Sequence, residues 1–144
     1  MIEDWKIKIS MLWIIASVAY VAHPIMVLSE PTTLAGIIAG RIDDAQITQA
    51  LLLDFAILIL VPLVMAFLSL ILRDLINRWA NAIVGVFFAL TYIKTVVNSF
   101  TLPSYSGALL TFVAFVASVL IVWYAWKSKP DLSTKKRKNS VAAP

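Results

Sequence analysis

The sequence contains no cysteine and a single histidine, His23, among its 144 residues. The absence of cysteine excludes disulfide bridges, thiolate metal sites, iron–sulfur clusters and thiol–disulfide chemistry. Charge is also scarce, because charged residues make up 14% of the chain, whereas soluble domains carry about 25%. Hydrophobic residues account for 61%. The surface of the folded chain is therefore expected to face lipid more than water.

The motifs of catalysis and cofactor binding are missing as well. The sequence has no glycine-rich phosphate loop, and one histidine cannot supply bis-histidine haem ligation. An intramembrane aspartyl hydrolase needs two carboxylates in one site, whereas Asp54 is the one acidic residue inside the hydrophobic segments. His23, Glu30 and Asp54 are too few and too scattered for a metal site. We therefore assign no catalytic residue, metal or cofactor and expect no nucleic-acid partner, and an enzymatic role ranks last.

Four segments are long and apolar enough to cross a membrane, which takes about 20 residues. They run over residues 9–28, 50–72, 79–100 and 106–126. The chain is accordingly predicted to be all-α, an integral membrane four-helix bundle with up-down-up-down topology. Residues 1–127 are expected to form the transmembrane domain, and residues 128–144 a basic, disordered cytoplasmic tail.

Lysine and arginine residues set the orientation, because they are enriched on the cytoplasmic side. Ten of the twelve precede the first segment, separate the second from the third or follow the fourth, whereas Arg41 lies on the opposite side and Lys94 within a segment. We expect a multi-pass protein of the cell membrane with both termini in the cytoplasm. Four basic tail residues are predicted to contact anionic lipid headgroups, or only to fix the topology: Lys135, Lys136, Arg137 and Lys138.

The connections between the segments predict further local structure. Pro31 favours the first turn of a short helix on the outer surface within residues 29–46. Thr48 is placed to cap the second segment. The tight connection over residues 73–78 and the short turn over residues 101–105 predict that consecutive segments are antiparallel neighbours.

Three ionisable side chains fall inside the segments, where each costs about 2.5–3.5 kcal/mol on insertion scales. His23, Asp54 and Lys94 lie about 21, 27 and 22 Å from the inner ends of their segments, at about 1.5 Å per residue. All three therefore fall in the outer half, in one layer about 6 Å thick. An ion pair between Asp54 and Lys94 would neutralise both charges, with His23 hydrogen-bonded to it.

A polar stripe accompanies this layer on the third segment, where four residues follow the helical spacing i, i+3, i+4 and i+7. Such a stripe is expected to face the bundle interior or a wet cavity. A purely structural role stays open, since a buried pair can fix helix register and a lysine can extend to the surface. The predicted ligand-binding set is His23, Asp54, Thr91, Lys94, Thr95 and Asn98.

Several short motifs resemble a family of small prokaryotic four-helix membrane proteins that is classified only as a domain of unknown function. The most specific is the Asn-Arg-Trp-Ala-Asn run over residues 77–81. Weaker matches are Leu12-Trp13, Gln46-Ile47-Thr48, Pro62 and residues 122–127, so that the resemblance covers about residues 5–127. It implies a four-helix bundle and a prokaryotic source but no activity.

Two functions remain open. The first is a bundle that binds or transports a small molecule, ion or lipid through the polar layer. Because four helices are few for a pathway, this role would require a homo-oligomer. The second is a non-catalytic subunit or assembly factor of a larger membrane complex, which short loops and absent catalytic motifs favour. Membrane lipids are expected partners in both cases.

Overall fold

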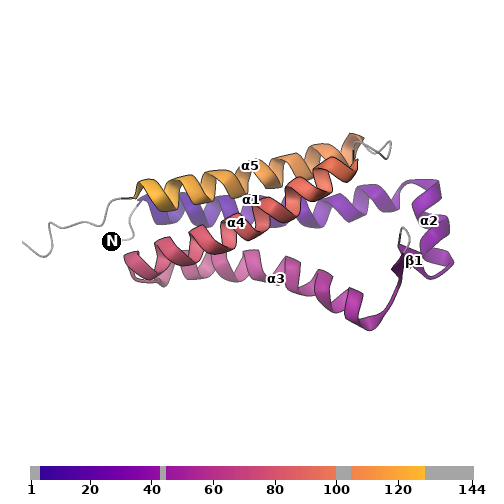
Figure 1. Ribbon diagram of the computed structural model, residues 1–144, viewed down its shortest axis with the longest axis horizontal. Helices are drawn as coiled ribbons and strands as arrows, with labels where there is room; N and C mark the ends of the chain where they lie inside the picture. Colours follow the sequence, from indigo (N-terminus) through magenta and orange to yellow (C-terminus); the bar gives the residue numbers. More distant parts are fainter. Residues whose placement is uncertain (1–3, 43–44, 100–104, 129–144) are drawn as a thin grey trace, which may run out of the picture.

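The computed structural model describes residues 4–42, 45–99 and 105–128. Four helices in it are long and apolar enough to cross a membrane, so the expected all-helical, membrane-compatible class is confirmed. A short helix and a two-stranded antiparallel hairpin, in which Arg41 pairs with Gln46, connect the first two of them. In chain order the elements are α1 (Asp4–Leu28), α2 (Pro31–Ile38), β1 (Arg41–Ile42), β2 (Ala45–Gln46), α3 (Gln49–Ile71), α4 (Asp74–Ser99) and α5 (Tyr105–Lys127) (Figure 1).

Two of the long helices begin earlier than predicted. Helix α1 starts at Asp4 rather than at residue 9, and α4 starts at Asp74 rather than at residue 79. Both added turns open with an aspartate, whose negative charge is favourable at the positive end of the helix dipole. Hydropathy alone missed these turns because their charged residues resemble a loop. The connection between α3 and α4 is shorter than expected in consequence.

The connection between α1 and α3 largely follows the sequence. Helix α2 begins at Pro31, with Glu30 in the extended conformation before it. Gly40 has a φ of 75°, the left-handed conformation that favours glycine, and this turns the chain from α2 into β1. The Thr48 hydroxyl accepts a hydrogen bond of 3.2 Å from the Leu51 amide, which confirms the predicted cap of α3. The hairpin was not predicted, since strands of two residues carry no sequence pattern.

Helix α5 packs against both α1 and α4 through a row of mostly small side chains. Small residues at such positions let helices approach closely when lipid supplies no hydrophobic driving force. A Cβ built on Gly85 of α4 would lie 2.8 Å from Cγ2 of Val122 in α5. Gly85 is thus the kind of small residue that lets α4 and α5 approach closely. The buried residues of α5 are Gly107, Thr111, Ala114, Ala117, Ser118, Ile121 and Ala125.

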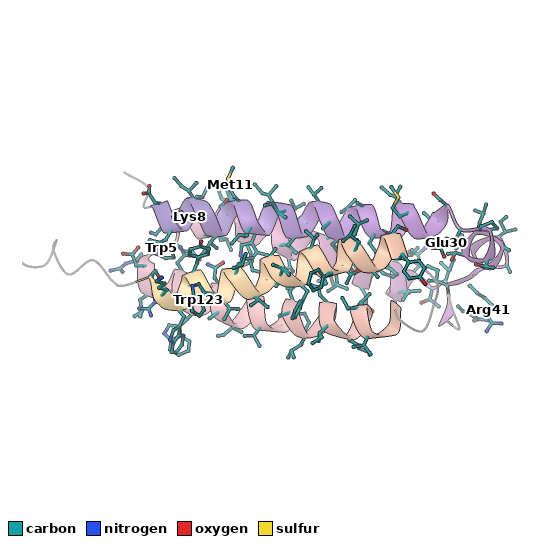
Figure 2. The ribbon with its side chains drawn as sticks, turned by 90° about the horizontal axis from the view of Figure 1, so that it is seen from above. Trp5, Lys8, Met11, Glu30, Arg41 and Trp123 are labelled. Carbon is teal, nitrogen blue, oxygen red and sulfur yellow. The ribbon has the colours of Figure 1, made fainter. Side chains whose placement is uncertain are left out.

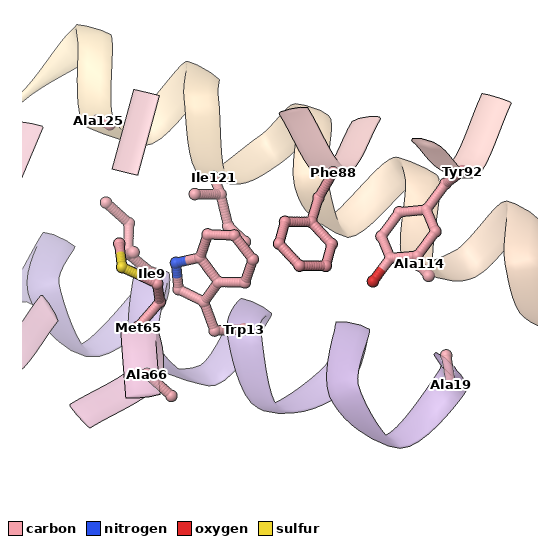
Figure 3. Close-up of a cluster of buried hydrophobic side chains, with 10 residues drawn as sticks. All are labelled: Ile9, Trp13, Ala19, Met65, Ala66, Phe88, Tyr92, Ala114, Ile121 and Ala125. Carbon is pink, nitrogen blue, oxygen red and sulfur yellow. The ribbon is translucent and has the colours of Figure 1, made fainter. Parts of the chain in front are cut away.

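Aromatic side chains fill the space that these small residues leave. Trp13 of α1 and Phe88 of α4 meet edge to face, with ring centroids 5.7 Å apart and planes at 84°. Tyr92 continues the row at 5.7 Å from Phe88, and all three are buried (Figure 3). The core therefore sits between α1, α4 and α5, and Met65 and Ala66 of α3 join it near the basic end.

The two ends of the bundle differ in composition. Lys8 and Trp123 lie at one end, whereas Glu30 and Arg41 lie at the other (Figure 2). The Lys8 ammonium sits 5.8 Å from the centre of the Tyr124 ring, which joins the start of α1 to the end of α5. We call these the basic end and the α2 end.

Helix α3 joins the bundle only over the half nearer the basic end. Its buried residues are Pro62, Met65, Ala66 and Ser69, whereas every residue from 52 to 57 is exposed. It packs on α1 and makes few contacts with α4, from which it diverges toward the α2 end (Figure 1). The predicted neighbour packing of these two helices is therefore wrong over much of their length, whereas that of α4 and α5 is confirmed.

Candidate functional site

The divergence of α3 leaves a groove of about 620 Å³ between α3 and α4. Its walls are apolar, and its polar residues are one acidic side chain and one hydroxyl. The lining residues are Asp54, Ile57, Leu58 and Val61 from α3, and Ile83, Val84, Phe87, Phe88 and Thr91 from α4.

The two polar residues of the groove lie at the same level on opposite walls. The same number of residues separates Asp54 from Ile71 as separates Asp74 from Thr91, so both lie about 26 Å from the basic end. Asp54 is exposed, and the Thr91 hydroxyl donates a 3.0 Å hydrogen bond to the Phe87 carbonyl. The structure thus brings two members of the predicted set to one end of one groove.

The rest of the polar stripe continues along α4 toward the α2 end. Lys94 is exposed and does not line the groove, and no ion pair joins it to Asp54 in the part of the chain that the structure describes. The Thr95 hydroxyl donates to the Thr91 carbonyl at 3.1 Å. Because α4 starts earlier than predicted, Lys94 lies about 30 Å from the basic end, beyond the level of Asp54. The side chain of Asn98 lies outside the described residues.

His23 belongs to α1 and is half-buried, but it is not among the residues that line the groove. Its place in the binding set remains a prediction. The headgroup-binding residues predicted in the tail lie outside the described residues: Lys135, Lys136, Arg137 and Lys138.

A second polar cluster, which was not predicted, lies buried in the half of the bundle near the basic end. The Trp13 indole donates a 2.6 Å hydrogen bond to Oδ1 of Asn81. The Asn81 amide donates to both Oδ1 and the carbonyl of Asn77. The Asn77 amide in turn donates to the Ser69 carbonyl at 2.6 Å, and its side chain and that of Asn81 are fully buried. This Trp-Asn network links α1, α4 and α3.

Two cationic side chains, Arg78 and Lys6, also hold the helices together at the basic end. Arg78 donates from Nε to the Ala125 carbonyl at 3.1 Å, and it also donates to the carbonyl of Trp126, so it caps the end of α5. Lys6 forms an ion pair of 2.7 Å with Asp74 and donates to the Leu72 carbonyl at the end of α3. Asp74 therefore pairs with α1 rather than within its own helix.

These contacts explain why the groove opens toward the α2 end. The Trp-Asn network and the contacts of Lys6 hold α3 to its neighbours near the basic end. The first half of α3 exposes bulky side chains, among them Leu53 at 61% and Leu60 at 59%. The short α3–α4 connection fixes the helices at one end and leaves their other ends apart.

One buried polar atom stands apart from both clusters. The Tyr92 hydroxyl has no hydrogen-bond partner among the described residues, although the side chain is fully buried. Its ring centre lies 5.7 Å from that of Tyr20 on α1. The described residues contain no group of three His, Asp or Glu side chains that could hold a metal ion.

Comparison with known proteins places the chain in one family. The model of a protein family described as a family of unknown function, DUF6326, matches residues 2–134. This confirms the resemblance to an uncharacterised family. No curated protein and no solved structure matches the chain.

Proposed function

The chain belongs to this family of unknown function, which supplies no activity, and we propose a function from the geometry of the groove. The protein binds a single-chain amphipathic molecule of the bilayer, with its apolar chain between α3 and α4 and its polar head at Asp54 and Thr91. The supporting observation is a groove of about 620 Å³ whose polar residues are confined to one end. That volume is within the range of about 300–1,000 Å³ typical of small-ligand sites, which fits one chain better than a whole two-chain lipid.

We further propose that α1, α3, α4 and α5 cross the cell membrane in up-down-up-down order with both termini cytoplasmic. The excess of lysine and arginine at the basic end supports this orientation. Since the chain has no cysteine, Thr32→Cys in α2 and Lys127→Cys in α5 each introduce a unique thiol. On intact cells an impermeant maleimide should label Thr32→Cys alone, and Lys127→Cys only after permeabilisation. The reverse pattern would show the opposite orientation.

The alternative role, as a homo-oligomer or a non-catalytic subunit of a larger complex, rests on a second groove. It lies between α4 and α5, has a volume of about 370 Å³ and contains no ionisable side chain. Because its lining contains no charged side chain, this groove suits a helix of a partner or of a second copy better than a molecule with a polar head. It is lined by Val86, Ala89, Leu90, Val119, Val122, Trp123 and Trp126.

Filling the α3/α4 groove should weaken binding strongly. Val84→Trp places a bulky ring among its walls, whereas Val119→Trp makes the same change in the α4/α5 groove. The measurement is photolabelling in vesicles by dodecanol with a diazirine in its chain, followed by peptide mapping. We expect labelling of α3 and α4 to fall about tenfold in Val84→Trp, as a loss of about 1.4 kcal/mol implies, and to persist in Val119→Trp. Equal labelling of wild type and Val84→Trp would refute the proposal.

A further inference from the structure

The polar end of the groove presents hydrogen-bond acceptors. The Asp54 carboxylate is exposed and, when ionised, has only acceptor oxygens. The Thr91 hydroxyl donates its hydrogen to the Phe87 carbonyl, so its oxygen can still accept a hydrogen bond through its lone pairs. Among the described lining residues, no side chain at this end has a free N–H or O–H to donate.

Pro62 leaves one main-chain acceptor of α3 without its usual helical donor. Proline has no N–H, so the Leu58 carbonyl lacks the donor that an α-helix normally provides four residues later. Leu58 is one of the residues that line the groove. A carbonyl without its helical partner in an apolar setting favours a ligand or neighbour that donates a hydrogen bond.

From this acceptor set we infer that the head of the bound molecule is a protonated amine. The inference rests on the proposed function, because it concerns the head of the molecule whose chain occupies the groove. An ammonium group is a compact cation with several donors and no acceptor, which complements a carboxylate and a hydroxyl oxygen. A carboxylate or phosphate head would instead face Asp54 with like charge. The ligand is thus a long-chain amine that enters from the bilayer.

Lys94 is the nearest described cation along α4, three residues beyond Thr91. It does not line the groove and its side chain is exposed, so its ammonium can extend toward the α2 end. Lys94 therefore provides a control of opposite charge for Asp54. Removal of the charge at Lys94 should not weaken an amine, whereas removal of the charge at Asp54 should.

The test compares dodecylamine, dodecanol and dodecanoate, each with a diazirine in the chain, on the full chain in vesicles. We expect the amine to label α3 and α4 about tenfold more efficiently than the alcohol, since a charge-assisted hydrogen bond is worth at least that factor. The preference should vanish in Asp54→Asn and remain in Lys94→Met, and Lys94→Met should also leave labelling by the alcohol unchanged.

Each other outcome overturns the inference in a distinguishable way. Equal labelling by amine and alcohol in the wild type would refute the amine head and leave the chain-binding groove standing. Preference for dodecanoate would assign the head to Lys94 instead. A loss of preference in Lys94→Met as large as in Asp54→Asn would show that Asp54 has no specific role. If none of the probes labels α3 and α4, the proposed function fails as well.

Discussion

Replacement of Asn81 by leucine is expected to lower the free energy of unfolding by about 2 kcal/mol. The change leaves the Trp13 indole N–H and the Asn77 side-chain oxygen without their buried partners. An orphaned buried polar group costs about 1–3 kcal/mol, although hydrogen bonds in membrane proteins average nearer 0.6 kcal/mol. Two orphaned groups therefore give a loss of about 2 kcal/mol. Unfolding by titration with denaturing detergent in mixed micelles measures it.

The control for this loss is an exposed position on the same helix. Leu90 is 64% exposed, so Leu90→Ala should change the free energy of unfolding by less than about 0.5 kcal/mol. A double-mutant cycle with Trp13→Phe isolates the hydrogen bond itself, with an expected coupling of about 1 kcal/mol. Additive losses in the double variant would mean that the indole and the amide do not interact.

The Trp-Asn network also accounts for the strongest motif in the sequence. Asn77 and Asn81 are buried in it, and Arg78 caps α5. The Asn-Arg-Trp-Ala-Asn run over residues 77–81 thus holds the helices together at the basic end. A binding role is not needed to explain it. We conclude that the motif defines the architecture, whereas the proposed ligand site lies in the α3/α4 groove.

Much of the fold could be predicted because its signals are local. Long apolar segments identify the four membrane-compatible helices, Thr48 and Pro31 mark helix starts, and small residues such as Gly85 mark close contacts. The first turn of α4 was not predicted, because charged residues such as Asp74 and Arg78 between two apolar segments are typical of a loop. Their partners, Lys6 and the end of α5, are distant in sequence.

The site was only partly predictable, for a related reason. The sequence placed Asp54 and Lys94 in one layer with a polar stripe beside it, and the structure brings Asp54 and Thr91, but not Lys94, to one groove. The sequence does not indicate that α3 diverges from α4, because this divergence depends on where polar contacts join the helices. Two asparagines at spacing i and i+4 in an apolar helix were the available signal for the missed network, since buried amides require partners.

The existence of an open groove can be tested with pairs of cysteines, since the chain has none of its own. Ile57 and Phe87 line opposite walls of the groove and are both substantially exposed. Gly85 and Val122 provide the control, because a Cβ at Gly85 would touch the valine side chain. A disulfide needs Cβ atoms about 3.5–4.5 Å apart, a condition that this control pair approaches and that a groove between the walls prevents.

The most direct measurement is therefore disulfide formation under mild oxidation in native membranes. We expect Gly85→Cys/Val122→Cys to cross-link almost completely and Ile57→Cys/Phe87→Cys to stay almost entirely reduced over the same time. Cross-linking of the 57/87 pair as fast as the control would show that α3 packs against α4 along its length, and would contradict the groove on which the proposed function depends.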